Sequence, residues 1–196
     1  MSKKRQYPVR TPRTAAGIRA QELHTGAGRS WWARRWQDTL ESMGLGARLG
    51  RGKNYAISGQ VIDLALEGPH VTAHVVGTRP DPYLVTVDFN TPDDDARARI
   101  VDALRAEPML VARLLADDLP LEVERLFVQN GCCLFPGGKL GPRRYDMTTA
   151  CTCPDYVNPC KHTSAVLMLL GEEIARRPAT LVELRGITLE ELCDED

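Results

Sequence analysis

Three cysteines and one histidine lie within twelve residues of this sequence, in the pattern C-x-C-x6-C-x-H formed by Cys151, Cys153, Cys160 and His162. In an extended segment, residues i and i+2 point to the same side, so Cys151 and Cys153 can direct both sulfurs at one point. Cys160 and His162 can approach that point from the far side of a short loop. Three thiolates and one imidazole complete the tetrahedral shell of a structural Zn²⁺ and leave no position for a catalytic water. The spacing therefore predicts one structural zinc ion.

The residues around these ligands carry a resemblance to a known family. Flanking segments are Cys153-Pro154-Asp155-Tyr156, Pro159-Cys160-Lys161-His162 and Ala165-Val166-Leu167. Together with the spacing, they resemble the SWIM zinc finger over about residues 144–172. More loosely, Tyr55-Ala56, Ser58–Val61 and Arg79–Tyr83 look like segments of bacterial SWIM-finger proteins, whose genes often accompany a SNF2-type helicase. The resemblance implies DNA binding, protein–protein interaction, or both, in a protein accessory to such a helicase.

A closed zinc site performs no reaction itself, so we expect a non-enzymatic recognition module. Two alternatives stay open. The first is a metal-dependent nuclease or transposase relative, which would need acidic side chains meeting around Mg²⁺, and Asp88, Asp93 and Asp95 are its only candidates. The second is a zinc or redox sensor in which oxidation of the three cysteines releases the metal.

Composition narrows the class of protein. The chain has 196 residues, 43% of them hydrophobic and 26% charged, which suffices for a buried core. No apolar run approaches the roughly 20 residues of a membrane span, and the basic N-terminus lacks the apolar stretch of a signal peptide. We therefore expect a cytoplasmic protein with no membrane partner, where cysteines favour metal binding over disulfides.

Positive charge is concentrated at the start of the chain. Residues 1–53 contain 12 Lys and Arg against 3 Asp and Glu, whereas the remainder contains 13 against 23. This asymmetry suggests an anionic partner or, equally, a basic arm folded onto an acidic body. The basic and aromatic residues expected to contact nucleic acid or a protein are Arg34, Arg35, Arg48, Arg51, Lys53, Lys139, Arg143, Arg144, Tyr145 and Lys161.

Periodicity predicts an α+β fold with an antiparallel β meander or small open barrel, a short helical bundle, and a C-terminal ββα-like SWIM zinc finger. The expected units are a basic flexible arm (1–29), a helix plus antiparallel sheet (30–90), a helical region (91–142), the finger (143–175), and a helical, acidic tail (176–196). In the second unit, an aromatic stripe of Trp31, Trp32 and Trp36 should bury against the body rather than bind a ligand.

Other segments carry narrower predictions. Gly44–Lys53 fails the phosphate-loop pattern and is interpreted as a flexible basic turn. Thr91 should cap a helix with Pro92 at its first position. His70 and His74 should lie on one face of the sheet, too far apart to share a metal. Cys132 and Cys133 should be buried apolar residues, and Cys193 has no assigned role.

Overall fold

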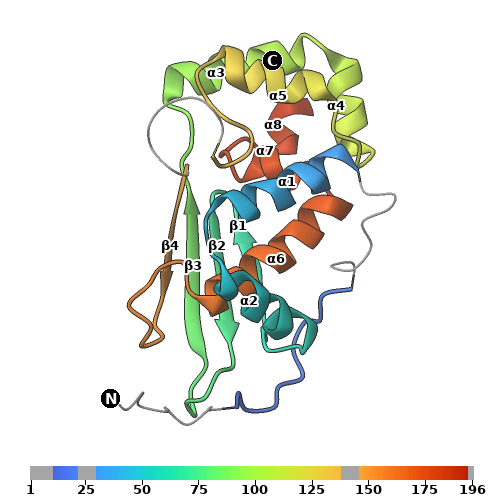
Figure 1. Ribbon diagram of the computed structural model, residues 1–196. Coiled ribbons are helices and arrows are strands. Elements are labelled where there is room, and N and C mark those ends of the chain that lie inside the picture. The colour runs from blue at the N-terminus through green and yellow to red at the C-terminus, as the bar shows by residue number, and fades with distance from the viewer. Residues whose placement is uncertain (1–10, 22–29, 138–145, 194–196) are drawn as a thin grey trace.

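The computed structural model describes residues 11–21, 30–137 and 146–193, and it is an α+β fold around an open sheet. The elements follow one another as α1 (Trp31–Ser42), α2 (Ala47–Ile57), β1 (Ala65–Glu67), β2 (His70–Val75), β3 (Tyr83–Phe89), α3 (Asp94–Arg105), α4 (Pro108–Leu115), α5 (Leu121–Gln129), β4 (Met147–Cys151), α6 (Lys161–Arg176), α7 (Thr180–Glu183) and α8 (Leu189–Cys193). The sheet is antiparallel throughout, in the order β1-β2-β3-β4. The predicted meander is confirmed, and it stays open rather than closing into a barrel (Figure 1).

Alternation of side chains places one face of the sheet in the core. In β2, Val71, Ala73 and Val75 are buried while the residues between them are exposed. This period of two is what a half-buried antiparallel strand requires. On the outer face, His70 pairs with Asp88 at 2.7 Å and His74 with Asp63 at 3.0 Å. Both histidines therefore have separate carboxylate partners.

Helix α6 lies across the inner face of the sheet and is the centre of the molecule (Figure 1). Every residue from 162 to 170 is buried, as expected for a helix with neighbours on all sides. Helix α1 is fixed to its surroundings by three indole N–H groups. Trp36 donates to the carbonyl of Leu167 at 3.0 Å, Trp32 to Ala175 at 3.3 Å, and Trp31 to Leu119 at 2.8 Å. The aromatic stripe thus packs against the body, as predicted.

The interpretation of Gly44–Lys53 as a flexible turn was wrong. Only its first residues turn, with positive φ at Gly44 and Gly46, and α2 begins at Ala47. Gly52 lies inside that helix, where a Cβ would come within 2.5 Å of Ser164 Cβ and 3.0 Å of Ala165 N. The backbones of α2 and α6 can approach this closely only because position 52 has no side chain. Packing against α6 thus overrides the weak helix propensity of glycine.

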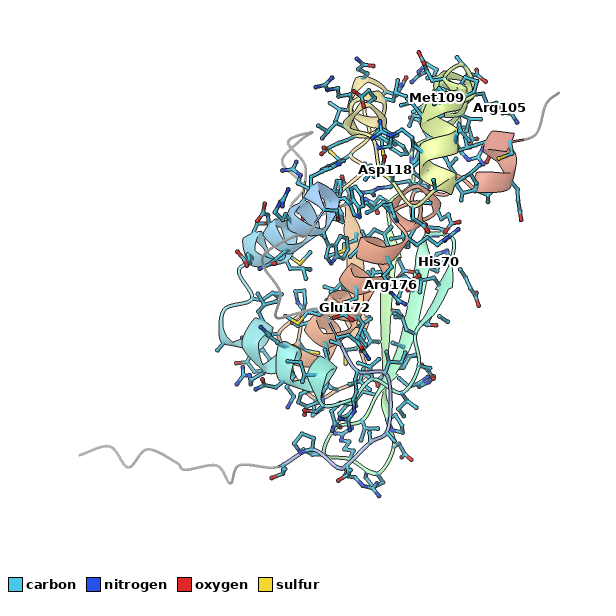
Figure 2. All side chains as sticks on the ribbon, turned by 90° about the vertical axis from the view of Figure 1, so that its right-hand side faces the viewer. His70, Arg105, Met109, Asp118, Glu172 and Arg176 are labelled. Atoms are coloured by element: carbon cyan, nitrogen blue, oxygen red, sulfur yellow. The ribbon has the colours of Figure 1, made fainter. Side chains whose placement is uncertain are left out.

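The helices α3, α4, α5, α7 and α8 cover the end of the molecule opposite α2 (Figure 1; Arg105, Met109 and Asp118 mark this end in Figure 2). The predicted cap of α3 was misplaced by two residues. Asp93, not Thr91, is the N-cap, and its carboxylate accepts from Ala96 N at 2.8 Å. Aspartate caps more strongly than threonine and also suits the positive end of the helix dipole.

A buried arginine fixes this end to the sheet. The Arg185 side chain is fully buried and donates to the carbonyls of Leu134 (3.2 Å), Asn90 (2.7 Å) and Asp146 (3.3 Å). Its guanidinium carbon also lies 5.9 Å from the centroid of the Phe89 ring. These carbonyls come from three separate connections, so one side chain ties together the ends of β3, α5 and β4.

Within the described ranges, no helix is long and apolar enough to cross a membrane.

Candidate metal centre

The four predicted ligands come together at one point. The sulfurs of Cys151, Cys153 and Cys160 and a ring nitrogen of His162 all lie within 4.8 Å of one another. Nδ1 of His162 is 3.8 Å from the Cys151 sulfur and 3.6 Å from the Cys160 sulfur. A tetrahedral zinc with ordinary bond lengths separates such donors by about 3.5–3.8 Å. The cluster therefore fits one structural zinc ion, and the Nδ1 atom is the ligand.

Three different elements supply these ligands. Cys151 ends strand β4, where it pairs with Val85 of β3, and Cys153 follows in the turn beyond it. Cys160 is the N-cap of α6, and His162 lies in the first turn of that helix. The finger has one strand of its own and uses β3 as the second, so the ββα arrangement is completed by the body of the protein.

The imidazole of His162 is held by aromatic rings. Its centroid lies 5.2 Å from that of Tyr55 on α2 and 4.7 Å from that of Tyr83 on β3, and only 4% of the residue is exposed. Gly77 leaves room for the Tyr83 ring beside the imidazole, because a Cβ at position 77 would lie 2.3 Å from a carbon of that ring. Metal-binding histidines usually donate their second N–H to a carbonyl or carboxylate. Among the described residues Nε2 has no hydrogen-bond partner, and the rings of Tyr55 and Tyr83 orient the ligand by packing.

The start of α6 favours a thiolate at Cys160. The pKa of the Cys160 thiol is lowered, first by the Cys151 thiol that hydrogen-bonds to it and then by His162 and Thr163. The same hydrogen bond raises the pKa of Cys151. The Thr163 hydroxyl lies 3.5 Å from the Cys160 sulfur, and the positive end of the helix dipole adds to the effect. This polar environment suits a zinc–thiolate cluster, whose net charge is −1.

The loop between the two ligand pairs is tied to its neighbours on both sides. Residues 154–159 cross the open edge of β4, where the Asn158 amide donates to the Thr149 carbonyl and accepts from the Thr149 hydroxyl at 3.0 Å. On the other side, Arg48 of α2 forms an ion pair with Asp155 at 3.6 Å. The Asp155 carboxylate also accepts from the Val157 N–H at 3.2 Å. The loop therefore has a defined shape and covers part of a strand edge that would otherwise be free to pair.

The structure separates the predicted basic surface into groups. Arg48, Arg51 and Lys161 lie beside the finger, where Arg51 and Lys161 line a small hollow together with Cys153, Pro154 and Asp155. Arg34 and Arg35 lie on the side of α1 that faces α5, and Arg35 pairs with Glu124 at 3.4 Å. Lys53 borders a groove between α1, α2 and α6. The remaining members, Lys139, Arg143, Arg144 and Tyr145, lie outside the described residues.

Sequence reasoning missed several residues that support the site. Tyr55 and Tyr83 hold the ligand ring, and Gly52 allows α2 to approach. Tyr55 and Tyr83 do fall in segments that resemble SWIM-finger proteins, which was the available signal. Their contacts with His162, however, span about 80 to 107 residues of sequence and follow no local pattern.

The acidic residues that were candidates for a nuclease site have ordinary structural roles. Asp93 caps α3, Asp95 lies in its first turn, and Asp88 pairs with His70. Among the residues that the structure describes, the Cys₃His cluster is the one group of three or more potential ligands close enough to share a metal. Cys133 is buried, as predicted, whereas Cys132, also predicted to be buried, is only half-buried.

Comparison with known proteins agrees with this geometry. The chain is 34% identical over 185 residues to the uncharacterized protein Rv2102 of Mycobacterium tuberculosis, an alignment that covers 94% of this chain and 65% of that relative. The chain thus spans just under two thirds of the relative's length. No solved structure matches it significantly. Residues 144–171 match the family model of the SWIM zinc finger, and all four ligands lie within that match, so this chain carries a SWIM zinc finger.

Proposed function

We propose that this chain is a non-enzymatic zinc-binding module that binds DNA through the side of the finger facing α2, as an accessory to a SNF2-type helicase. The observation that carries the proposal is the set of cations beside the zinc-held loop: Arg48, Arg51 and Lys161, here called the basic face. The zinc ion has no open coordination position when all four ligands bind. Its contribution is to hold the loop and the start of α6 in place next to these cations.

The three cations of the basic face differ in what they can offer a phosphate. Arg51 is exposed and, among the described residues, has no acidic partner. The Lys161 ammonium lies 4.9 Å from the centroid of the Tyr55 ring, which fixes its position without neutralising its charge. Arg48 is already paired with Asp155. Arg51 is therefore expected to contribute most to phosphate binding.

Charge reversal at Arg51 tests the proposal. Arg51→Glu should weaken DNA binding about tenfold or more at low salt and should reduce the slope of log affinity against log salt by about one or more. Fluorescence anisotropy with labelled DNA across a salt series measures both. Arg125→Glu is the matched control, because Arg125 is an exposed arginine on α5 at the opposite end of the molecule. Absence of binding by the wild-type protein at low salt would overturn the direct-contact proposal.

A second candidate function, docking on the helicase without DNA contact, has its own supporting observation. A groove of about 270 Å³ lies between α1, α2 and α6, with Trp36, Leu40 and Met168 among its lining residues. Glu172, labelled in Figure 2, borders this groove on α6. An apolar groove with a charged rim is typical of a site that takes a partner's apolar side chain.

Filling the groove distinguishes the two functions. Gly50 borders the groove, and a Cβ there would meet nothing within 4 Å, so Gly50→Leu can occupy it without disturbing the core. If the groove docks the helicase, this variant should lose co-purification with the co-expressed SNF2-type ATPase, should keep its zinc, and should not differ from wild type in the DNA-binding assay. If it retains the ATPase, the groove has no part in docking.

A further inference from the structure

One aromatic side chain of the finger projects fully into solvent. Tyr156 is 96% exposed, whereas Tyr55 and Tyr83 beside the metal site are 7% and 4% exposed. A tyrosine ring that packs against other groups buries a large apolar area. In the isolated protein the Tyr156 ring stays in contact with water, so this burial does not contribute to its stability. Tyr156 is also the middle of the loop, three residues after Cys153 and four before Cys160.

The loop that carries Tyr156 is held before any ligand arrives. Both of its ends are zinc ligands, and the residues on either side of the tyrosine share the Asp155–Val157 hydrogen bond at 3.2 Å. Asn158 is fixed to Thr149 of β4, and Asp155 to Arg48 of α2. A partner that contacts Tyr156 therefore meets a largely preorganised loop and loses little additional entropy in ordering it.

The surroundings of Tyr156 indicate an anionic partner with flat rings. The residue before it, Asp155, lines the same hollow of about 180 Å³ as Arg51 and Lys161. The Asp155 carboxylate is paired with Arg48, which reduces its repulsion of an anion in the hollow. Cations in the hollow and an exposed aromatic ring on the residue after Asp155 are the two elements of single-strand recognition, namely contacts to the backbone and stacking on bases.

We propose that Tyr156 stacks on an unpaired base while Arg51 and Lys161 contact the adjoining phosphate, so that the finger prefers single-stranded nucleic acid to duplex. This proposal rests on the proposed function and specifies its ligand. In a duplex both faces of each internal base are already covered by neighbouring bases, and insertion of a side chain requires unstacking them. An unpaired strand offers free faces and a flexible backbone that can reach the hollow at the same time.

The test compares one oligonucleotide sequence as a single strand and as a duplex, with binding measured by anisotropy at fixed low salt. Wild-type protein should bind the single strand more tightly. Tyr156→Ala should weaken single-strand binding about 5- to 100-fold and leave duplex binding nearly unchanged. Tyr156→Phe, which keeps the ring and removes only the hydroxyl, is the matched control and should bind like wild type. A 2-aminopurine base in the strand should be quenched by wild type and by Tyr156→Phe, but not by Tyr156→Ala.

Zinc content of each variant, expected to equal that of wild type, confirms that the loop remains closed. Equal loss in Tyr156→Phe and Tyr156→Ala would assign the effect to the hydroxyl and overturn stacking. If Arg51→Glu weakens binding while Tyr156→Ala does not, the proposed function stands and this inference fails. If wild type binds neither form, the proposed DNA contact itself fails. Loss of the ATPase from Tyr156→Ala, with nucleic-acid binding intact, would make the loop a protein contact instead.

Discussion

The two ends of the molecule are held together by different physical means, although α6 and the sheet run between them (Figure 1). At one end, three thiols and an imidazole converge beside aromatic rings, and α2 approaches α6 to backbone contact. At the other, the fully buried side chain of Arg185 donates to main-chain carbonyls at the ends of separate elements. We call these the metal end and the arginine end.

The two ends are expected to differ in whether their stability depends on a bound ligand. The arginine end is held by contacts within the polypeptide, namely an apolar core that includes Ile100, Leu104 and Phe127 and the Arg185 hydrogen bonds to main-chain carbonyls. At the metal end, three sulfurs and a buried imidazole converge on one point, and a bound cation completes this arrangement. We therefore expect the stability of the metal end to follow zinc, and that of the arginine end to be independent of it.

The largest expected effect comes from breaking the metal end. Cys160→Ser removes a zinc ligand at the N-cap position of α6, so zinc should fall from one ion per chain to a small fraction of that, and local stability should drop by several kcal/mol. Hydrogen exchange should quicken in residues 147–165 and in α2, and stay slow in α3 and α5. Metal analysis and exchange mass spectrometry measure the two effects.

Cys193→Ser is the control for this experiment, because Cys193 is exposed and lies outside the cluster. It should retain full zinc content. Exchange that quickens uniformly over the whole chain in Cys160→Ser would show that the two ends do not differ in their dependence on the metal.

The arginine end can be broken separately. Arg185→Met keeps much of the side-chain volume but leaves the carbonyls of Leu134 and Asn90 without their donor, whereas the Asp146 carbonyl keeps the Asn90 N–H. Because buried acceptors without partners cost about 1–3 kcal/mol each, and relaxation recovers part of this, the free energy of unfolding should fall by about 3 kcal/mol. Denaturant unfolding measures it. Zinc content should remain at one ion per chain, and a variant that loses zinc would contradict the separation of the two ends.

A smaller effect is expected where α2 meets α6. Gly52→Val places a branched side chain where Ser164 and the α6 backbone already lie, so overpacking should destabilise the protein by about 1–3 kcal/mol. Zinc binding should also weaken, because α2 carries Tyr55, whose ring packs against the ligand His162. Thermal unfolding and zinc competition with a chelator measure these changes.

Gly50→Ala is the matched change within the same helix. Its Cβ meets nothing within 4 Å, and the residue has no positive φ, so replacing glycine should stabilise the protein by about 0.5–1 kcal/mol. Equal effects at both positions would mean that the close approach at Gly52 does not matter.

Local features of the sequence predicted much of this structure. The zinc ligands were predictable because the spacing of Cys151, Cys153, Cys160 and His162 lets a short chain bring its donors to one point. Alternating residues in β2 and β3 predicted a half-buried meander, and the tryptophan stripe predicted the packing face of α1. The start of α3 was misplaced by two residues because Thr91 and Asp93 are both competent caps, and propensity alone does not select between them.

Tertiary contacts determined the rest. Gly44–Lys53 has the local composition of a turn, and most of it is helical only because α6, more than 100 residues later, receives Gly52 at backbone distance. The same distant contacts place Tyr55 and Tyr83 around the ligand histidine and leave Tyr156 in solvent. The sequence alone determined which residues would bind zinc, because all four lie within twelve consecutive residues and a short loop brings them together. Which side chains surround that site was decided by packing between segments far apart in the chain.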